Sequence, residues 1–351
     1  MSSRVGYIDI AKGLGILIIV LGHNNFFRNS KELYSIIFSF HVPLFLFLSG
    51  FFFKPNISLV KLIVKKSDSL LKPYFFTVIV LAPIYIIFFK VNIGQYFLFC
   101  FFYGIGATAN WAPLWFLPHL FLLFIFSWFL FKILKIDRVK IYLQLLPIVL
   151  LLVIGSNYIN SFWMMPLVLA DKYLIKLICL PFSADLLLVT SFYFLLGYLL
   201  KDYFEKLVNK PIILVLAALC FLTIHLYFDY TIDLFLRKYD SIIFSTVLAL
   251  LGIYIILSGS YFIDKFNSIL SSIIRYIGQN SLIIYIFHYF LQNKSYAILS
   301  TVAPWFLRYN AFLSFIIAFS LSLLIVLIIK KIKILSLFYY PLNIIQVRYT
   351  K

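Results

Sequence analysis

The sequence predicts an all-α integral membrane protein with about ten transmembrane helices and both termini in the cytoplasm. Of the 351 residues, 64% are hydrophobic and 12% are charged, whereas soluble domains are about half apolar and about a quarter charged. The mean hydropathy is +1.05. Long apolar runs alternate with short basic segments along the whole chain. These observations place the protein in a lipid bilayer.

A helix needs about 20 residues to cross the hydrocarbon core of a bilayer. Ten segments satisfy this length, namely 8–26, 34–53, 73–90, 114–132, 141–157, 184–200, 211–228, 241–259, 273–292 and 310–329. Two further apolar stretches, 94–105 and 162–182, are too short or too broken to assign as spans. No polar stretch is long enough to fold alone, so residues 1–351 are expected to form a single membrane domain.

The basic residues predict the orientation. With the N-terminus in the cytoplasm, more than two thirds of the 30 lysines and arginines fall on the cytoplasmic side, as the positive-inside rule requires. The net charge of +18 comes from small groups between apolar runs. A nucleic-acid partner is therefore not expected. The three cysteines are far apart, so neither a disulfide framework nor a zinc site is expected.

The first predicted helix carries Lys12 and His23, eleven residues apart. At 100° per residue they lie on one face, about 16 Å apart along the axis. Asp9 stands three residues before Lys12 and is expected to neutralise it. A plainer interpretation is that Lys12 extends to the cytoplasmic interface and His23 caps the helix, because interfacial positions suit both side chains.

The second predicted helix enters from the outer side and carries His41 about 10 Å below its outer end. His41 is thus expected at a depth similar to that of His23. Ionisable groups inside a bilayer are costly and usually functional, so two histidines beside a lysine favour a site. His119 and His225 are interpreted as structural. His288, near the polar Gln279–Ser281 run, is left open.

Several enzyme classes are not supported by any motif. The sequence has no phosphate-binding loop, no HExxH and no nucleophile elbow. It has only 12 acidic residues, and none pair in mid-membrane as a glycosidase or a carboxylate relay would need. The alternative from another class is a transporter or flippase of lipid-linked sugars. Transporters commonly show internal repeats and polar groups at the midplane, and no repeat is visible here.

Two blocks, DIAKGLGILIIVLGH (9–23) and FSFHVPLFLFLSGFFFK (38–54), closely resemble the opening of the acyltransferase 3 family of integral membrane acyltransferases. The branch that they resemble most is the fucose 4-O-acetylase-like sugar O-acetyltransferases. Lys12 and His23 match the family's first-helix motif, and His41 begins its HxPLFxFLSG block. PLWFLPHLF (113–121) and GQNSLIIYIFH (278–288) resemble later blocks in the same order.

The chain departs from the family in the loop that precedes Pro73. Arginines are common there in the family, whereas this chain has Lys65, Lys66 and Lys72. Lysine offers charge to a phosphate but lacks the bidentate fork of arginine. The alternative interpretation of these lysines is positive-inside topology alone.

The resemblance implies transfer of acetyl from cytoplasmic acetyl-CoA to a hydroxyl of a cell-surface polysaccharide or of its lipid-linked sugar precursor. His23 and His41 would be catalytic, and Lys12, Lys65, Lys66 and Lys72 would bind CoA without any metal. Trp115 or His288 would bind substrate or stabilise the oxyanion. The expected location is the inner membrane of a bacterium. Capsule, O-antigen and exopolysaccharide all fit as acceptors, and the oligomeric state is open.

Overall fold

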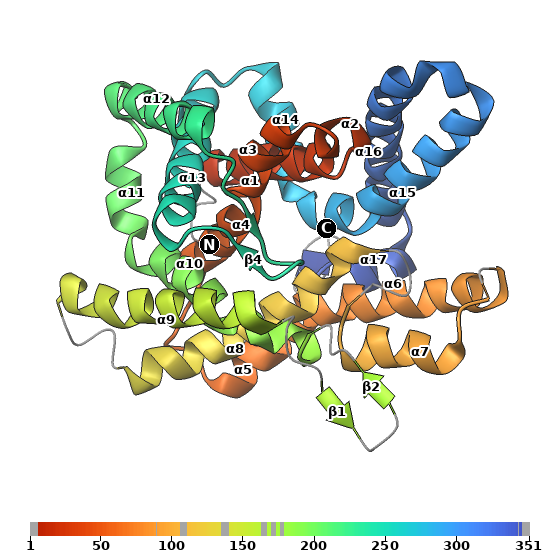
Figure 1. Cartoon of the computed structure of the whole chain (residues 1–351), viewed down its shortest axis with the longest axis horizontal. Helices are drawn as coiled ribbons and strands as arrows, with labels where there is room; N and C mark the ends of the chain where they lie inside the picture. The colour runs from red at the N-terminus through yellow and green to blue at the C-terminus, as the bar shows by residue number, and fades with distance from the viewer. Residues whose placement is uncertain are drawn as a thin grey trace. The chain divides into compact units, whose positions relative to one another are not determined.

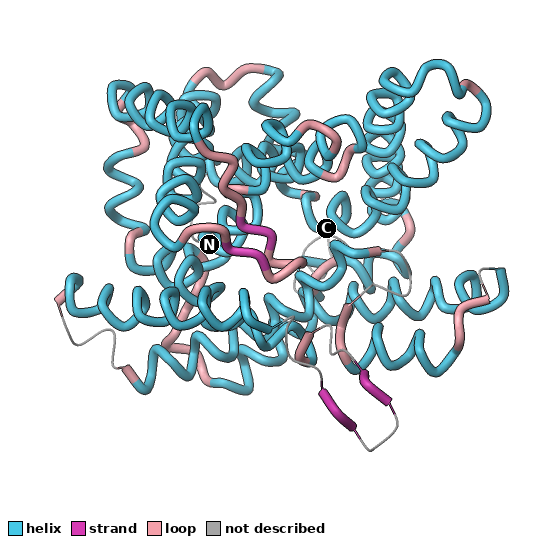
Figure 2. Tube along the Cα trace, viewed as in Figure 1, coloured by secondary structure: helices cyan, strands magenta, loops and turns pink. Residues whose placement is uncertain are grey.

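The computed structural model describes residues 6–88, 90–105, 111–134, 140–162, 167–169, 173–175, 179–342 and 344–345. Helices dominate these residues (Figure 1). The described strands form two short antiparallel hairpins, β1 (Leu167–Leu169) with β2 (Tyr173–Ile175) and β3 (Ile232–Asp233) with β4 (Lys238–Tyr239) (Figure 2). The predicted all-α architecture is confirmed.

Each of the ten predicted spans overlaps a described helix. Within the described residues, seven helical stretches are long and apolar enough to cross a membrane, and the number is nine if each of two bent helix pairs is counted as one span. The seven are Lys31–Phe51, Leu59–Phe88, Ala112–Ile133, Leu143–Asn160, Pro181–Leu199, Ile242–Lys265 and Tyr309–Lys331. The predicted span 8–26 corresponds to α1 (Gly6–Gly22), which has 17 residues. The chain is therefore a multi-pass membrane protein.

The chain folds into two compact units. Unit 1 comprises Met1–Phe52 and Tyr193–Leu324, and unit 2 comprises Phe53–Phe192 and Ile325–Lys351. Unit 1 contains α1, α2 (Asn25–Arg28), α3 (Lys31–Phe38), α4 (His41–Phe51), α11 (Lys201–Leu207), α12 (Pro211–Tyr227), α13 (Ile242–Lys265), α14 (Ile269–Gln279) and α15 (Ser281–Val302). Helices α10 (Leu187–Leu199) and α16 (Leu307–Lys331) run from one unit into the other.

Unit 2 contains α5 (Leu59–Lys66), α6 (Lys72–Pro83), α7 (Ile93–Phe97), α8 (Phe116–Ile133), α9 (Ile141–Phe162) and α17 (Lys333–Tyr339). Single π-helical turns at Ser67–Leu71, Ile84–Phe88 and Leu98–Phe102 continue α5, α6 and α7. The apolar stretch 94–105 is thus largely a short helix. Part of the stretch 162–182 lies outside the described residues.

Helix α1 is the centre of unit 1, where it packs on α4, α13, α14 and α15. It crosses α14 at backbone distance. A Cβ atom on Gly278 would lie 1.7 Å from the carbonyl oxygen of Asp9, and one on Gly13 would lie 2.2 Å from that of Ile274. Small residues at membrane helix crossings allow such approach. Gly13 and Gly278 therefore allow α1 and α14 to cross with their backbones in contact.

The predicted second span is not one continuous helix. It divides at Ser39 and Phe40 into α3 and α4, and Phe40 has φ −143° and ψ −12°. The Phe40 ring packs where a Cβ on Gly252 of α13 would stand, 2.4 Å from the ring's Cγ. Pro43 is tolerated because the first turn of a helix has unused N–H groups. The break leaves His41 as the first residue of α4.

The predicted span 273–292 was wrong as a single helix. Helices α14 and α15 meet at an angle of 80°. Asn280 at the junction has φ −112° and ψ 13°, and its Nδ2 donates to the carbonyl oxygen of Tyr276 at 2.6 Å. A side chain that satisfies a terminal carbonyl competes with helix continuation. The pair α11 and α12 is bent more strongly, by 103°.

Labelling from the two sides of the membrane tests the predicted topology. Asn29 and Asn56 are both exposed and precede and follow the second predicted span. We expect a cysteine at Asn29 to react with an impermeant maleimide in intact cells, and one at Asn56 to react only after permeabilisation, because the orientation follows the basic residues. Reaction of both cysteines in intact cells would contradict the cytoplasmic N-terminus.

Candidate active site

Three histidines from different parts of the chain meet in unit 1. His23 lies just beyond α1, His41 begins α4 and His288 lies within α15. The ring centroids of His23 and His288 are 5.5 Å apart. The Phe38 ring lies 4.5 Å from His41 and 6.3 Å from His23, edge-on to both. The structure therefore brings the two predicted catalytic histidines together and adds His288 to them.

His41 is held by the helix break. Its Nδ1 lies 2.9 Å from the carbonyl oxygen of Ile37, in the last turn of α3. A carbonyl can only accept, so Nδ1 donates, and the other ring nitrogen of a neutral imidazole then carries the lone pair. The residue is 5% exposed. The break in the second span thus satisfies a terminal carbonyl and leaves the lone pair of His41 on Nε2.

His288 is held in the same way within α15. Its Nδ1 lies 2.8 Å from the carbonyl oxygen of Tyr285 and 3.2 Å from that of Ile284. The residue is 0% exposed, and its Nε2 has no hydrogen-bond partner among the described residues. Because Nδ1 is the donor of the neutral ring, Nε2 of His288 carries a lone pair that no described residue uses.

His23 is the most accessible of the three, because it is partly exposed whereas His41 and His288 are buried. Its ring contacts His288, Phe38 and the Tyr289 ring, whose centroid is 5.2 Å away. Tyr289 did not stand out in the sequence. Only its position next to His288 could have identified it.

Lys12 has the partner that the sequence predicted. Its Nζ is 3.8 Å from Oδ1 of Asp9, and it also lies 4.5 Å from the centroid of the Phe52 ring. Asp9 is buried, and its Oδ2 accepts from Nε2 of Gln279 at 3.2 Å. The ion pair on α1 is therefore tied to the end of α14.

The other predicted binding residues belong to unit 2. Lys65 is exposed, and Nζ of Lys66 lies 3.3 Å from the centroid of the Phe124 ring. Nζ of Lys72 pairs with Asp68 Oδ1 at 2.5 Å and donates to the carbonyl oxygen of Tyr340 at 2.8 Å. These contacts give Lys72 a structural role that the sequence did not reveal.

Trp115 and His119 are neighbours in unit 2, with ring centroids 5.4 Å apart. Nδ1 of His119 lies 3.3 Å from the carbonyl oxygen of Phe182, and its Nε2 lies 3.0 Å from Oγ1 of Thr190. Both ring nitrogens of this buried histidine have partners, which agrees with its structural interpretation. Across the part of the chain that the structure describes, no group of three His, Cys, Asp or Glu side chains could hold a metal ion.

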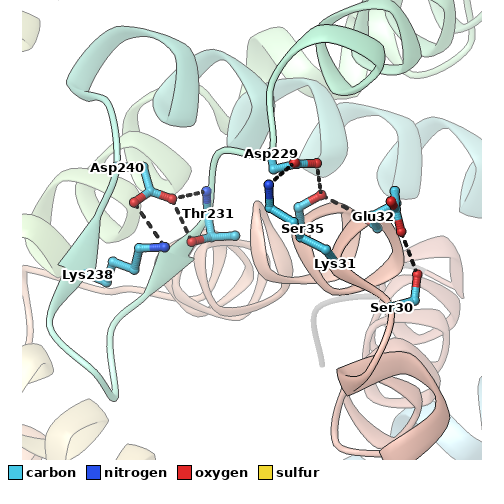
Figure 3. Close-up of polar contacts among 8 residues, drawn as sticks. All are labelled: Ser30, Lys31, Glu32, Ser35, Asp229, Thr231, Lys238 and Asp240. Atoms are coloured by element: carbon cyan, nitrogen blue, oxygen red, sulfur yellow. Dashed lines mark hydrogen bonds and ion pairs between the residues drawn. The ribbon is translucent and has the colours of Figure 1, made fainter.

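A polar segment around β3 and β4 forms an ion pair and a hydrogen bond with α3 (Figure 3). Lys31 Nζ pairs with Asp229 Oδ2 at 2.8 Å, and Asp229 also accepts from Ser35 Oγ at 3.5 Å. The hydrogen bond from Lys31 lowers the pKa of Asp229 below its ordinary value. The Asp229 carboxylate therefore stays charged at neutral pH.

Tyr34 connects this segment to the histidine cluster. Its hydroxyl donates to Oδ2 of Asp233 at 2.7 Å. Its ring stacks on Phe38 with the centroids 3.9 Å apart, and Phe38 contacts both His23 and His41. Aromatic pairs prefer defined geometries, so the position of the Phe38 ring depends on the segment held by Tyr34.

A protein-family model matches most of this chain. The family model described as an Acyltransferase domain, of the acyltransferase 3 family, matches residues 5–331. No curated protein and no solved structure gives a significant match. The matched range includes the three clustered histidines, the Lys12–Asp9 pair and the lysines before Pro73. It also favours acyl transfer over the transporter alternative. The chain belongs to the acyltransferase 3 family of integral membrane acyltransferases.

Proposed function

We propose that this membrane acyltransferase transfers acetyl from cytoplasmic acetyl-CoA to a hydroxyl of a cell-surface polysaccharide or of its lipid-linked sugar precursor. The bacterial inner membrane is the proposed location. The observation that carries the site assignment is the His23–His288 pair, in which a partly exposed imidazole lies beside a buried one with an unpartnered Nε2. The donor and the acceptor follow from the sugar O-acetyltransferase branch that the first two sequence blocks resemble.

The proposed reaction needs a base. The acceptor hydroxyl attacks the thioester carbonyl, a new ester C–O bond forms, and the C–S bond breaks. The hydroxyl proton goes to a histidine, and the CoA thiolate leaves and takes up a proton. A hydroxyl is a poor nucleophile until its proton is removed, and an imidazole with an ordinary pKa of about 6.5 suits that task. General acid–base catalysis alone accelerates a reaction by about 10²–10⁴-fold.

We assign the base to His23, because it is the least buried of the three rings. A catalytic histidine is usually oriented by a third group, which accepts a hydrogen bond from the second ring nitrogen. Nε2 of His288 is our candidate for that acceptor, because Nδ1 of the same ring is already used as a donor and Nε2 bonds to no described residue, His23 included. From the sequence, His41 could orient the base, bind the thioester carbonyl or share the proton. In the structure the His288 ring contacts that of His23, with the centroids 5.5 Å apart, so we give the orienting role to His288.

In this proposal, His41 accepts a hydrogen bond through its Nε2. Because its Nδ1 donates to Ile37, the neutral ring can accept a proton or a hydrogen bond at Nε2 but cannot donate there. We therefore place it at the acceptor hydroxyl. Stabilisation of the oxyanion needs a donor, and the indole N–H of Trp115 in unit 2 remains our candidate for it.

CoA is anionic, so its phosphates should meet lysines on the cytoplasmic side. Lys12, Lys65, Lys66 and Lys72 remain the candidates. Lys65 is exposed, whereas Lys72 already pairs with Asp68. We therefore expect phosphate binding to depend more on Lys65 and Lys66, and Lys72 to contribute more to the stability of unit 2.

This division can be tested by kinetics. Replacing Lys65 and Lys66 together with alanine should raise KM for acetyl-CoA while kcat changes less, because these lysines would serve ground-state binding. The Lys206→Ala/Lys210→Ala double variant removes two exposed lysines of unit 1 and is the charge-matched control. An unchanged KM in the Lys65/Lys66 variant, at normal expression, would remove this segment from the donor site.

The function itself is tested with purified protein in lipid nanodiscs. Radiolabelled acetyl-CoA is supplied together with glycan or lipid-linked sugar from cells that lack the protein. We expect the label to enter the sugar fraction as an alkali-labile ester. Mass spectrometry of surface glycan should show acetyl groups only in cells that contain the protein. Folded protein that leaves both the label and the glycan unchanged would refute the proposed donor and acceptor.

A further inference from the structure

Two buried amides stand next to the paired histidines. Asn24 follows His23 directly, and Gln292 follows His288 by one turn of α15. Residues four apart share one face of a helix, so Gln292 and His288 project from α15 in the same direction. Asn24 is 1% exposed and Gln292 is 2% exposed. Neither amide takes part in the proposed chemical step.

The two amides bond to each other. With the Gln292 amide oriented to match its neighbours, its oxygen accepts from the backbone N of Asn24 at 3.1 Å and from Asn24 Nδ2 at 2.7 Å. Its nitrogen donates to the carbonyl oxygen of Val20 at 3.1 Å. Gln292 therefore joins α15 to both the last turn of α1 and the residue after His23.

Asn24 uses its remaining groups to hold α1 to two further segments. Its Oδ1 accepts from the backbone N of Phe26 at 2.9 Å and thereby caps α2. Its Nδ2 donates to the carbonyl oxygen of Ala311 at 2.7 Å and lies 3.4 Å from Ser314 Oγ, both on α16. A fully satisfied buried network rigidifies its surroundings. The backbone that carries His23 is thus fixed on α2, α15 and α16.

We propose that Asn24 and Gln292 are positioning residues that set the separation and relative orientation of the His23 and His288 rings. The proposal rests on the proposed function, because it assigns these amides to the same histidine pair. A shift of about 1 Å at a reacting group can reduce a rate by about 10²-fold. Loss of the amide bonds should therefore affect the chemical step more than the binding of substrates.

Asn310 offers a matched control in the same unit. It is also buried, at 1% exposure, and its Nδ2 donates to the carbonyl oxygens of Ala303 at 2.7 Å and Leu299 at 3.3 Å, at the end of α15. Its bonds do not include the residues that flank His23 or His288. Asn310→Ala removes a buried amide of the same kind without touching the pair.

The test compares Asn24→Ala, Gln292→Met and Asn310→Ala in nanodiscs, with Met chosen because it preserves volume. We expect all three to unfold at lower temperature. Asn24→Ala and Gln292→Met should lower kcat by about 10-fold or more, should leave KM for acetyl-CoA nearly unchanged, and should alter the pH profile of kcat. The Asn24→Ala/Gln292→Met double variant should be little slower than either single variant, because each of these proteins lacks the same side-chain bond between Asn24 and Gln292. Asn310→Ala should keep kcat and its pH profile.

A measurement that does not depend on catalysis distinguishes the positioning role from the proposed function. In protein with ¹⁵N-labelled histidine, the ring-nitrogen signals of His23 and His288 should move in Gln292→Met and stay in place in Asn310→Ala. Unchanged ring signals and unchanged kcat in both amide variants would overturn the positioning role. If the signals move although the wild type transfers no acetyl group, the positioning role stands and the proposed reaction fails.

Discussion

Replacing His23 with alanine should lower acyl transfer by about 10²–10⁴-fold, the usual loss when a general base is removed. The loss should appear in kcat, because the base acts on the chemical step and contributes little to the binding of CoA. His288→Ala should lose activity by a similar factor, since an unoriented imidazole is a poor base. The measurement is the initial rate of radiolabelled acetyl transfer at matched amounts of folded protein.

The double variant distinguishes a pair from two separate contributions. If His23 and His288 act as one unit, the His23→Ala/His288→Ala protein should be scarcely slower than either single variant. His41→Ala should also lose most activity. His119→Gln is the control, because His119 is bonded on both ring nitrogens within unit 2. Near-normal transfer by His23→Ala, with His119→Gln also active, would reject His23 as the base.

Gly278→Ala should cause a large loss of stability, because its Cβ would lie 1.7 Å from the carbonyl oxygen of Asp9. Overpacking a well-packed contact costs about 1–3 kcal/mol and occasionally more. Here the obstacle is backbone, which cannot rotate away, so we expect at least the upper end of that range. The readout is the unfolding midpoint in detergent, together with acyl transfer by the protein that remains folded.

Gly259→Ala is the matched control, because no described atom beyond its chain neighbours and the backbone of its own helix lies within 4 Å of the position where its Cβ would be built. A glycine in a helix is about 0.5–1 kcal/mol less favourable than alanine, so this variant should be as stable as the wild type or slightly more stable. A Gly278→Ala protein with the same midpoint as Gly259→Ala would show that α1 and α14 do not cross so closely.

The spans and the two leading histidines could be predicted because their signals are local. Hydropathy over about 20 residues identifies a membrane helix. Helical periodicity placed Lys12 and His23 on one face, and the expected Asp9–Lys12 pair is present in the structure. The site assignment itself stays a prediction.

The parts that could not be predicted depend on distant contacts. The 80° bend between α14 and α15 is set by the Asn280 side chain and by the packing of Gly278 on α1, and neither changes the hydropathy of the segment. The approach of His288 to His23 follows from that bend. The Asn24–Gln292 bond could not be predicted either, because the sequence does not indicate which distant residue an amide in an apolar run will bond to.

The contact between Asn24 and Ala311 has a consequence for the synthesis of the chain. These residues are 287 positions apart, and ribosomes add about 5–20 residues per second. For about 15–60 s, therefore, the first helix stands in the membrane before its last partner has been made. An amide without a partner in hydrocarbon is costly, so Asn24 should stay at the aqueous boundary during this interval. The pair of histidines then assembles only when α15 and α16 arrive, which makes activity the last property that the growing protein acquires.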